Sequence, residues 1–212
     1  MFLKTLSNSN VISVIIPFFV VLIIITMKKI VLFASGTGSN VEKIIEFFRL
    51  DSSIKVSAVF CNNPDAEVLK RAIANHIPVV IFSKDDLKSG LVTKKVSTFS
   101  PSLIVLAGFL LHLPLHFVES FAGKIINIHP ALLPKHGGKG MYGKYVHQAV
   151  LDHGDKETGI TIHYVNEHYD KGEVIFQMAV AIDDCKDADE ISKRVQKLEH
   201  DFLPRIIEQI LK

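Results

Sequence analysis

The sequence has few cysteines, no strong charge imbalance and no familiar metal-binding motif. Cys61 and Cys185 are its only cysteines, and neither has a CxxC or zinc-ligand spacing, so we expect two free thiols in a reducing compartment. With 24 basic and 22 acidic residues the formal net charge is +2, which gives no indication of nucleic-acid binding. Ten histidines are present, but there is no HExxH or comparable cluster, and Pro114 interrupts the pair His112 and His116. No metal site is therefore expected.

The first 26 residues differ in kind from the rest of the chain. Residues 11–25 (VISVIIPFFVVLIII) form an apolar run shorter than the roughly 20 residues of a usual membrane-spanning helix. One interpretation is a signal peptide, although no small-residue cleavage site follows the run. A second is a signal anchor, with Lys28 and Lys29 holding the domain on the cytoplasmic side. A third is sequence upstream of a true start at Met27.

The third interpretation is favoured by the apolar segment at 30–34, which we expect to be a central strand. A membrane helix that ended before Met27 would leave about three linker residues, on the order of 10 Å at full stretch. A central strand could hardly lie so close to a bilayer. We therefore expect residues 1–26 to be a hydrophobic extension from a mis-assigned start, and residues 27–212 to be a cytoplasmic functional domain with no membrane partner.

From Lys28 onward, short apolar runs alternate with amphipathic stretches. The apolar runs are rich in Val, Ile and Leu without strict alternation, as in strands that are covered on both faces. Strands are expected at 30–34, 55–61, 78–82, 103–107, 124–128, 158–166 and 173–182. Helices are expected at 40–50, 65–75, 87–99, 115–121, 145–152 and 187–211, with a glycine-rich loop at 135–144. This order predicts one α/β domain with a doubly wound, mostly parallel, Rossmann-like sheet.

Residues 35–40 (SGTGSN) follow the first predicted strand and open the first helix. Glycines let the backbone approach an anion closely, and a helix N-terminus adds a favourable dipole. Ser39 and Glu42 fit a capping box. Val41 replaces the third glycine of GxGxxG, and the GK[ST] of a Walker loop is missing. The segment is either a plain strand–helix turn or, as we favour, a cradle for one phosphate at the carboxyl ends of the strands.

Asn127 and His129 end the fifth predicted strand in the sequence NIHP. Residues two apart in a strand face the same way, and Pro130 keeps His129 out of helical dihedrals. A carboxamide beside an imidazole at this end of a sheet suits an oxyanion formed in acyl transfer. The alternative is a structural asparagine and a core histidine.

A second polar cluster, residues 166–172 (NEHYDKG), lies between the last two predicted strands. An aspartate shortly before a glycine, as in the sequence Asp170-Lys171-Gly172, is commonly a turn residue. If folding brings Asp170 to His129, however, the carboxylate would raise the pKa of the histidine and keep it protonated near neutral pH.

Four segments together resemble one family. SGTGSN at 35–40, LAGF at 106–109, NIHPALLP at 127–134 and the aspartate at 170 occur in the order and approximate spacing of the phosphoribosylglycinamide formyltransferases. The resemblance runs from about Lys28 to the C-terminus. It implies an enzyme that transfers the formyl group of 10-formyltetrahydrofolate, its co-substrate, to the amine of 5-phosphoribosylglycinamide in purine biosynthesis.

The resemblance also implies roles for individual residues. Asn127, His129 and Asp170 match the catalytic trio, in which the amide and a protonated imidazole stabilise a tetrahedral oxyanion. The residues matched to the phosphoribosyl substrate are Gly38, Ser39, Asn40, Gln196 and Glu199. Those matched to the folate are Lys84, Leu110, Leu111, His112, Leu113, Asn127, Asn166, Glu167, His168, Tyr169 and Asp170. Neither a metal nor a nucleic-acid partner is implied, and a monomer or weak homodimer is expected.

Other functions share parts of this pattern. Methionyl-tRNA formyltransferases have a similar NIHxSLLP core but normally carry a C-terminal barrel domain, and formyltetrahydrofolate hydrolases normally carry an N-terminal regulatory domain. A non-catalytic phosphate- or folate-binding module is a further alternative, as is a membrane-tethered protein. The loop at 136–145 is longer and richer in glycine than the family's commonest form, so its substrate contacts are not carried over from the family.

Overall fold

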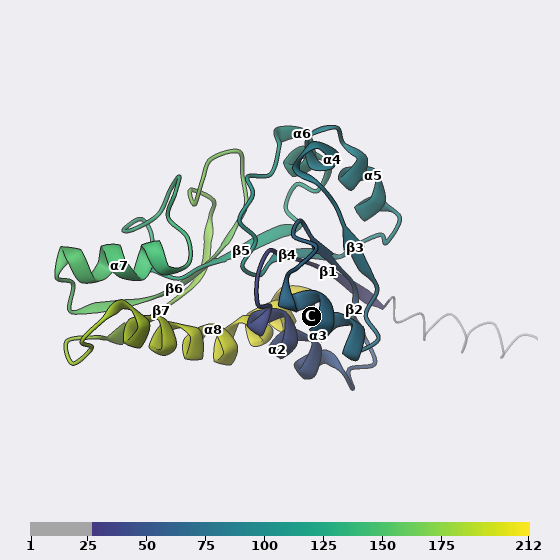
Figure 1. Ribbon diagram of the computed structural model, residues 1–212. Helices are drawn as coiled ribbons and strands as arrows, with labels where there is room; N and C mark the ends of the chain where they lie inside the picture. The colour runs from purple at the N-terminus through teal and green to yellow at the C-terminus, as the bar shows by residue number, and fades with distance from the viewer. Residues whose placement is uncertain (1–26) are drawn as a thin grey trace, which may run out of the picture.

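The computed structural model describes residues 27–212 (Figure 1). The interpretations of residues 1–26 lie outside the described residues. The strands are β1 (Lys28–Ala34), β2 (Ile54–Cys61), β3 (Val79–Ile81), β4 (Leu103–Leu106), β5 (Ile125–His129), β6 (Glu157–Tyr164) and β7 (Val174–Ala181). The helices are α2 (Ser39–Phe48), α3 (Glu67–Ala74), α4 (Lys84–Lys88), α5 (Leu91–Ser97), α6 (Leu115–Ser120), α7 (Lys144–His153) and α8 (Ala188–Leu211).

The described strands form one sheet in the order β3-β2-β1-β4-β5-β6-β7. β1 to β5 pair in parallel, whereas β6 is antiparallel to both β5 and β7. The chain first builds outward from β1 to β3 and then returns to place β4 on the other side of β1. Such a reversal opens a crevice at the carboxyl ends of the strands. The prediction of a single α/β domain with a doubly wound, mostly parallel sheet is confirmed.

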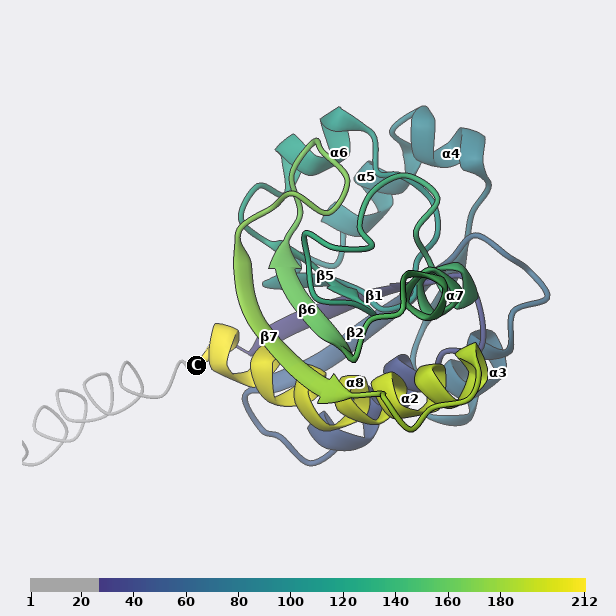
Figure 2. The ribbon, with the colours of Figure 1, turned by 90° about the vertical axis from the view of Figure 1, so that its left-hand side faces the viewer.

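Helices cover both faces of the sheet. In Figures 1 and 2, α2, α3 and α8 lie on one side, and α4, α5 and α6 lie on the other. The sequence of β1 is continuously apolar because successive side chains point to opposite faces of the sheet and both faces are covered. Ile30 and Leu32 belong to the core under α2 and α8, whereas Val31 and Phe33 belong to the core under α5 and α6. Phe33 stacks on Phe60 with 5.1 Å between ring centroids.

Two local predictions about helices were wrong. The helix expected at 87–99 is instead a pair, α4 and α5, separated by Gly90, whose φ of +84° ends any continuous helix. The first of the pair starts one turn earlier than expected because Ser83 and Asp86 form a capping box. In α3, the sequence pattern predicts that Val68, Ala72 and Ile73 face inward, but Ile73 is 64% exposed and Leu69 is buried instead.

Cys61 and Cys185 are free, as expected, the first buried in β2 and the second partly exposed. Between residues 27 and 212, no helix has both the length and the apolar character needed to cross a bilayer.

Candidate active site

A cavity of about 650 Å³ opens at the carboxyl ends of the central strands. It is lined by the turn between β1 and α2, the segment after β4, the end of β5, the glycine-rich loop, the loop between β6 and β7, and one side of α8. All the residues predicted for catalysis and for the phosphoribosyl substrate line it, as do all those predicted for the folate except Lys84 and Glu167. Lys84 lies exposed at the start of α4. The sequence motifs therefore meet in one place.

The turn between β1 and α2 is built to approach a ligand closely. Gly38 has a φ of +75°, and a Cβ at this position would overlap the side chain of Val68, so only glycine fits. The amide of Val68 donates to the Gly36 carbonyl at 3.1 Å and fixes the turn against α3. The amide of Glu42 makes the first bond of α2, to the Gly38 carbonyl at 2.9 Å. The amides before it are the free donors of a helix N-terminus, which suits an anion.

The capping box predicted for Ser39 and Glu42 is absent. Gly38 occupies the N-cap position without a side-chain capping bond, and Ser39 is already the first helical residue. Its hydroxyl instead accepts a hydrogen bond from Gln196 of α8 at 3.2 Å. The serine is therefore turned toward the cavity that it lines.

A second contact joins this turn to α8. The Asn40 amide nitrogen donates to Glu199 Oε2 at 2.8 Å, while the Asn40 Oδ1 atom is buried and has no hydrogen-bond partner among the described residues. Burial raises the pKa of Glu199 to about 7, although the Asn40 bond opposes the shift. The predicted substrate residues thus form a polar group in which one carboxyl is close to half-protonated at neutral pH.

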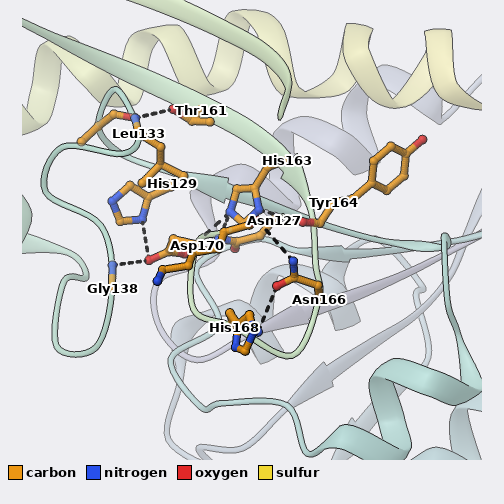
Figure 3. Close-up of polar contacts among 12 residues, drawn as sticks. Asn127, His129, Leu133, Gly138, Thr161, His163, Tyr164, Asn166, His168 and Asp170 are labelled. Atoms are coloured by element: carbon orange, nitrogen blue, oxygen red, sulfur yellow. Dashed lines mark hydrogen bonds and ion pairs between the residues drawn. The ribbon is translucent and has the colours of Figure 1, made fainter. Parts of the chain in front are cut away.

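Asn127, His129 and Asp170 are brought together by the antiparallel end of the sheet (Figure 3). Asn127 and His129 lie on β5, and Asp170 lies on the loop that follows β6. Asp170 Oδ2 is 3.7 Å from His129 Nδ1 and accepts a hydrogen bond from the Gly138 amide at 2.8 Å. Asp170 has a φ of +52°, an uncommon conformation for an aspartate that turns its side chain into the site.

His163 is a buried member of the site that the sequence reasoning missed. It lies on β6 directly opposite Asn127 and is only 2% exposed. Its Nδ1 donates to the Tyr164 carbonyl at 2.9 Å, so Nε2 can accept from the Asn127 amide nitrogen at 3.2 Å. Nε2 also lies 3.7 Å from Asp170 Oδ1. The register of β5 with β6, which no local motif reveals, was the signal needed to find it.

The expectation that Asp170 keeps His129 protonated was wrong for the protein without substrate. Burial lowers the pKa of His129, and it outweighs the opposite effects of the Asp170 charge and the His136 carbonyl. The neutral ring donates from Nε2 to the His136 carbonyl at 2.8 Å. Its Nδ1 then faces Asp170 without a proton.

Asp170 itself remains ionised. Burial favours the neutral form, but His163 and His129, when protonated, and the hydrogen bond from Gly138 lower the pKa of this carboxyl below its usual range. A neutral imidazole next to a buried carboxylate is a ready acceptor for one proton.

The two segments predicted to surround the pterin meet across the cavity. The rings of His112 and Tyr169 lie 4.3 Å apart between centroids. The Leu110 amide donates to the Ser35 hydroxyl at 3.0 Å, which ties its segment to the end of β1. In the opposite loop, the Asn166 side chain accepts from the His168 amide at 2.9 Å. The pairing gives the cavity one largely apolar end, as a flat heterocycle requires.

The family model described as formyl transferase matches residues 28–207. The chain is 35% identical to phosphoribosylglycinamide formyltransferase of Bacillus subtilis, over 87% of this chain and 95% of that protein. It is 38% identical to the chloroplastic phosphoribosylglycinamide formyltransferase of Arabidopsis thaliana, over 85% of this chain but only 64% of that longer protein.

Solved structures agree with the sequence comparison. The phosphoribosylglycinamide formyltransferase of Anaplasma phagocytophilum superposes with a TM-score of 0.81 at 31% identity, with 88% of each chain covered. That of Brucella melitensis gives a TM-score of 0.79 at 32% identity, over 88% of this chain and 96% of that one.

Proposed function

The chain belongs to the formyl transferase family, and on that premise we propose that it transfers the formyl group of 10-formyltetrahydrofolate to the amine of 5-phosphoribosylglycinamide. The relatives at 35–38% identity include several named for this reaction. The proposal also takes from them a place in purine biosynthesis. It treats residues 27–212 as the functional unit, acting in the cytoplasm as a monomer or weak homodimer on small molecules alone.

One observation carries the proposal: a single cavity contains both an anion-binding turn and a group suited to acyl transfer. Gly38, Ser39 and Asn40 would hold the substrate phosphate at the start of α2. Gln196 and Glu199 of α8 already contact this turn, so they would bind the adjoining ribose. The folate would lie at the opposite end, against the paired His112 and Tyr169 rings. The formyl carbon would then lie near Asn127 and His129.

The reaction forms one C–N bond and breaks another at the formyl carbon. Attack by the substrate amine gives a tetrahedral oxyanion, and Asn127 would donate to it from the amide hydrogen that His163 does not use. A well-placed donor of this kind is worth about 3 kcal/mol in the transition state. Collapse of the intermediate expels the folate nitrogen and leaves the formamide product.

His129 is neutral before reaction and would become charged by taking up the proton that the attacking amine loses as the oxyanion develops. Negative charge on the oxyanion raises the pKa of the nearby imidazole, and Asp170 stabilises the imidazolium once it forms. The same proton would then pass from His129 to the leaving folate nitrogen, through Asp170 or a water that it holds, which restores the neutral imidazole. The proposed reaction therefore needs neither a metal nor a covalent enzyme intermediate.

A spectrophotometric assay tests the proposal directly. Protein lacking residues 1–26 is mixed with a 10-formyl folate, with and without 5-phosphoribosylglycinamide, and deformylation is followed. We expect deformylation only when the acceptor is present, with formylated acceptor formed in equal amount. Deformylation without acceptor would indicate a hydrolase, and binding of both ligands without turnover would indicate a binding module.

A further inference from the structure

A group of three metal-ligating side chains lies outside the cavity, behind the glycine-rich loop. His136 precedes the glycines of that loop, His153 is the last residue of α7, and Asp155 follows the turn that ends the helix. Their imidazole nitrogens and carboxylate oxygen all lie within 4.8 Å of one another. No other group of this kind occurs between residues 27 and 212. Because α7 separates His136 from Asp155, the three residues form no single local sequence motif.

We propose that His136, His153 and Asp155 form a binding site for a divalent transition-metal ion of the zinc type. Two imidazoles and one carboxylate are a usual ligand set for Zn²⁺ and Co²⁺, which also accept a water as the fourth ligand. A hollow of about 290 Å³ lies beside the group, lined in part by His136 and Asp155, and gives space for that water.

The present distances are close to what coordination requires. Asp155 Oδ2 is 2.7 Å from His136 Nε2, and Asp155 Oδ1 is 3.0 Å from His153 Nδ1. Tetrahedral Zn²⁺ with bonds of about 2.0–2.2 Å would place its ligand atoms about 3.4 Å apart. These two contacts therefore need to lengthen by less than about 1 Å, and the two imidazole nitrogens, which lie within 4.8 Å of each other, need to reach the same spacing.

The backbone holds two of the ligands in place. The amide of Asp155 donates to the Val150 carbonyl at 3.3 Å, and Gly154, with a φ of +72°, turns the chain so that Asp155 folds back on the helix end. His136 lies in the left-handed region, with a φ of +52°. The side chains of His136 and Asp155 are each only 12% exposed, whereas that of His153 is 64% exposed. The site is thus open on one side.

The opposing feature is Lys135, whose ammonium lies 3.2 Å from Asp155 Oδ1. Its positive charge disfavours a cation, and a purely structural role for Asp155 would be to bind this lysine and the two histidines. The side chain of Lys135 is 65% exposed, so it can move into solvent when a metal enters. The two roles make opposite predictions for removal of the lysine.

The site would be linked to the reaction cavity through His136. The backbone carbonyl of His136 accepts the hydrogen bond from His129, while its ring is the proposed metal ligand. The proposal itself does not depend on the function of the cavity, because its test measures metal binding and not turnover.

The test uses tag-free protein treated with a chelator and then titrated with Co²⁺, whose visible spectrum reports tetrahedral nitrogen and oxygen ligands, and with Zn²⁺ by calorimetry. We expect a single saturable site for each ion. His153→Gln, a change at an exposed position that leaves the fold intact, should weaken binding at least about tenfold, as should Asp155→Asn. Lys135→Ala should tighten it. The matched control His76→Asn, an exposed histidine remote from the group, should leave it unchanged.

Three outcomes would overturn the site. They are no saturable binding of Zn²⁺ to the unmodified protein, equal binding by the unmodified protein and His153→Gln, and loss of binding in the His76→Asn control. Weaker binding by Lys135→Ala would also count against the site, because it would show that the lysine does not compete with the ion.

Discussion

Substitution of Glu199 by glutamine should change how the stability of the protein depends on pH. Glutamine keeps the shape of the side chain and can still accept the hydrogen bond from Asn40, but it cannot ionise. The carboxyl of Glu199 has a pKa of about 7 in the folded protein, raised by burial from 4.5. The variant therefore isolates the cost of charging this one group.

The sign and size of the effect follow from linkage. A carboxyl whose pKa is raised by folding stabilises the folded state below pH 4.5, and this contribution is lost as the pH rises through about 7. Each pKa unit corresponds to about 1.4 kcal/mol, so the whole effect is about 3 kcal/mol. Because Glu199 is only partly buried, this figure is an upper limit. As the pH rises from 5 to 8, the free energy of unfolding of Glu199→Gln should therefore increase by up to about 3 kcal/mol relative to that of the unmodified protein.

Urea unfolding at pH 5, 6, 7 and 8 measures this directly. The difference in free energy of unfolding between the two proteins removes the titration of all other groups, including the histidines. Glu119→Gln, the same substitution at an exposed position of α6, provides the control measurement. If the difference in unfolding free energy between Glu199→Gln and the unmodified protein does not change with pH, then Glu199 is charged at no unusual cost. That result would refute the description of this polar group.

Three further substitutions test other parts of the site. Asn127→Ala removes an oxyanion donor, so in steady-state assays it should lower kcat by about 10²–10³-fold with little change in the KM for the acceptor. A fall in kcat of less than about threefold would argue against that role. In Gly38→Ala the new Cβ would overlap Val68 at a φ of +75°. The variant should therefore lose about 1–3 kcal/mol of unfolding free energy in urea and have a higher KM for the phosphorylated acceptor. An equally stable variant would show that the turn can relax. Burial lowers the pKa of His147 to about 4, and the neighbouring His129 adds to this effect once acid protonates it. The unmodified protein should therefore lose about 3 kcal/mol of stability relative to His147→Gln as the pH falls from about 6.5 toward 4. Parallel stability curves would contradict this.

The fold could be predicted because its signals are local. The run around β1 is apolar at successive positions since both faces of the strand are covered, and the same holds for β4. The break at Gly90 was missed because the helical spacing of Val92 and Val96 continues beyond it. The positive φ of Gly90, which separates the two helices, is known only from the backbone of the structure.

The site could be predicted only in part, because parts of it depend on register and burial. Residues in motifs, such as Asn127 and His129, were identified from the sequence. His163 belongs to no motif and enters the site only through its pairing with β5. The pKa of His129 was predicted in the wrong direction, because the sequence suggested the nearby carboxylate but not the nearly complete burial of the ring.

The central claim is that a neutral, buried His129 acts together with a carboxylate that reaches it from the loop after β6. The kcat of Asp170→Asn in the acceptor-dependent assay tests this most directly, with Asp201→Asn as the control and circular dichroism to verify the fold. We predict that Asp170→Asn keeps its fold and loses at least about tenfold in kcat, whereas the control does not. Unchanged turnover in the folded Asp170→Asn protein would contradict the claim.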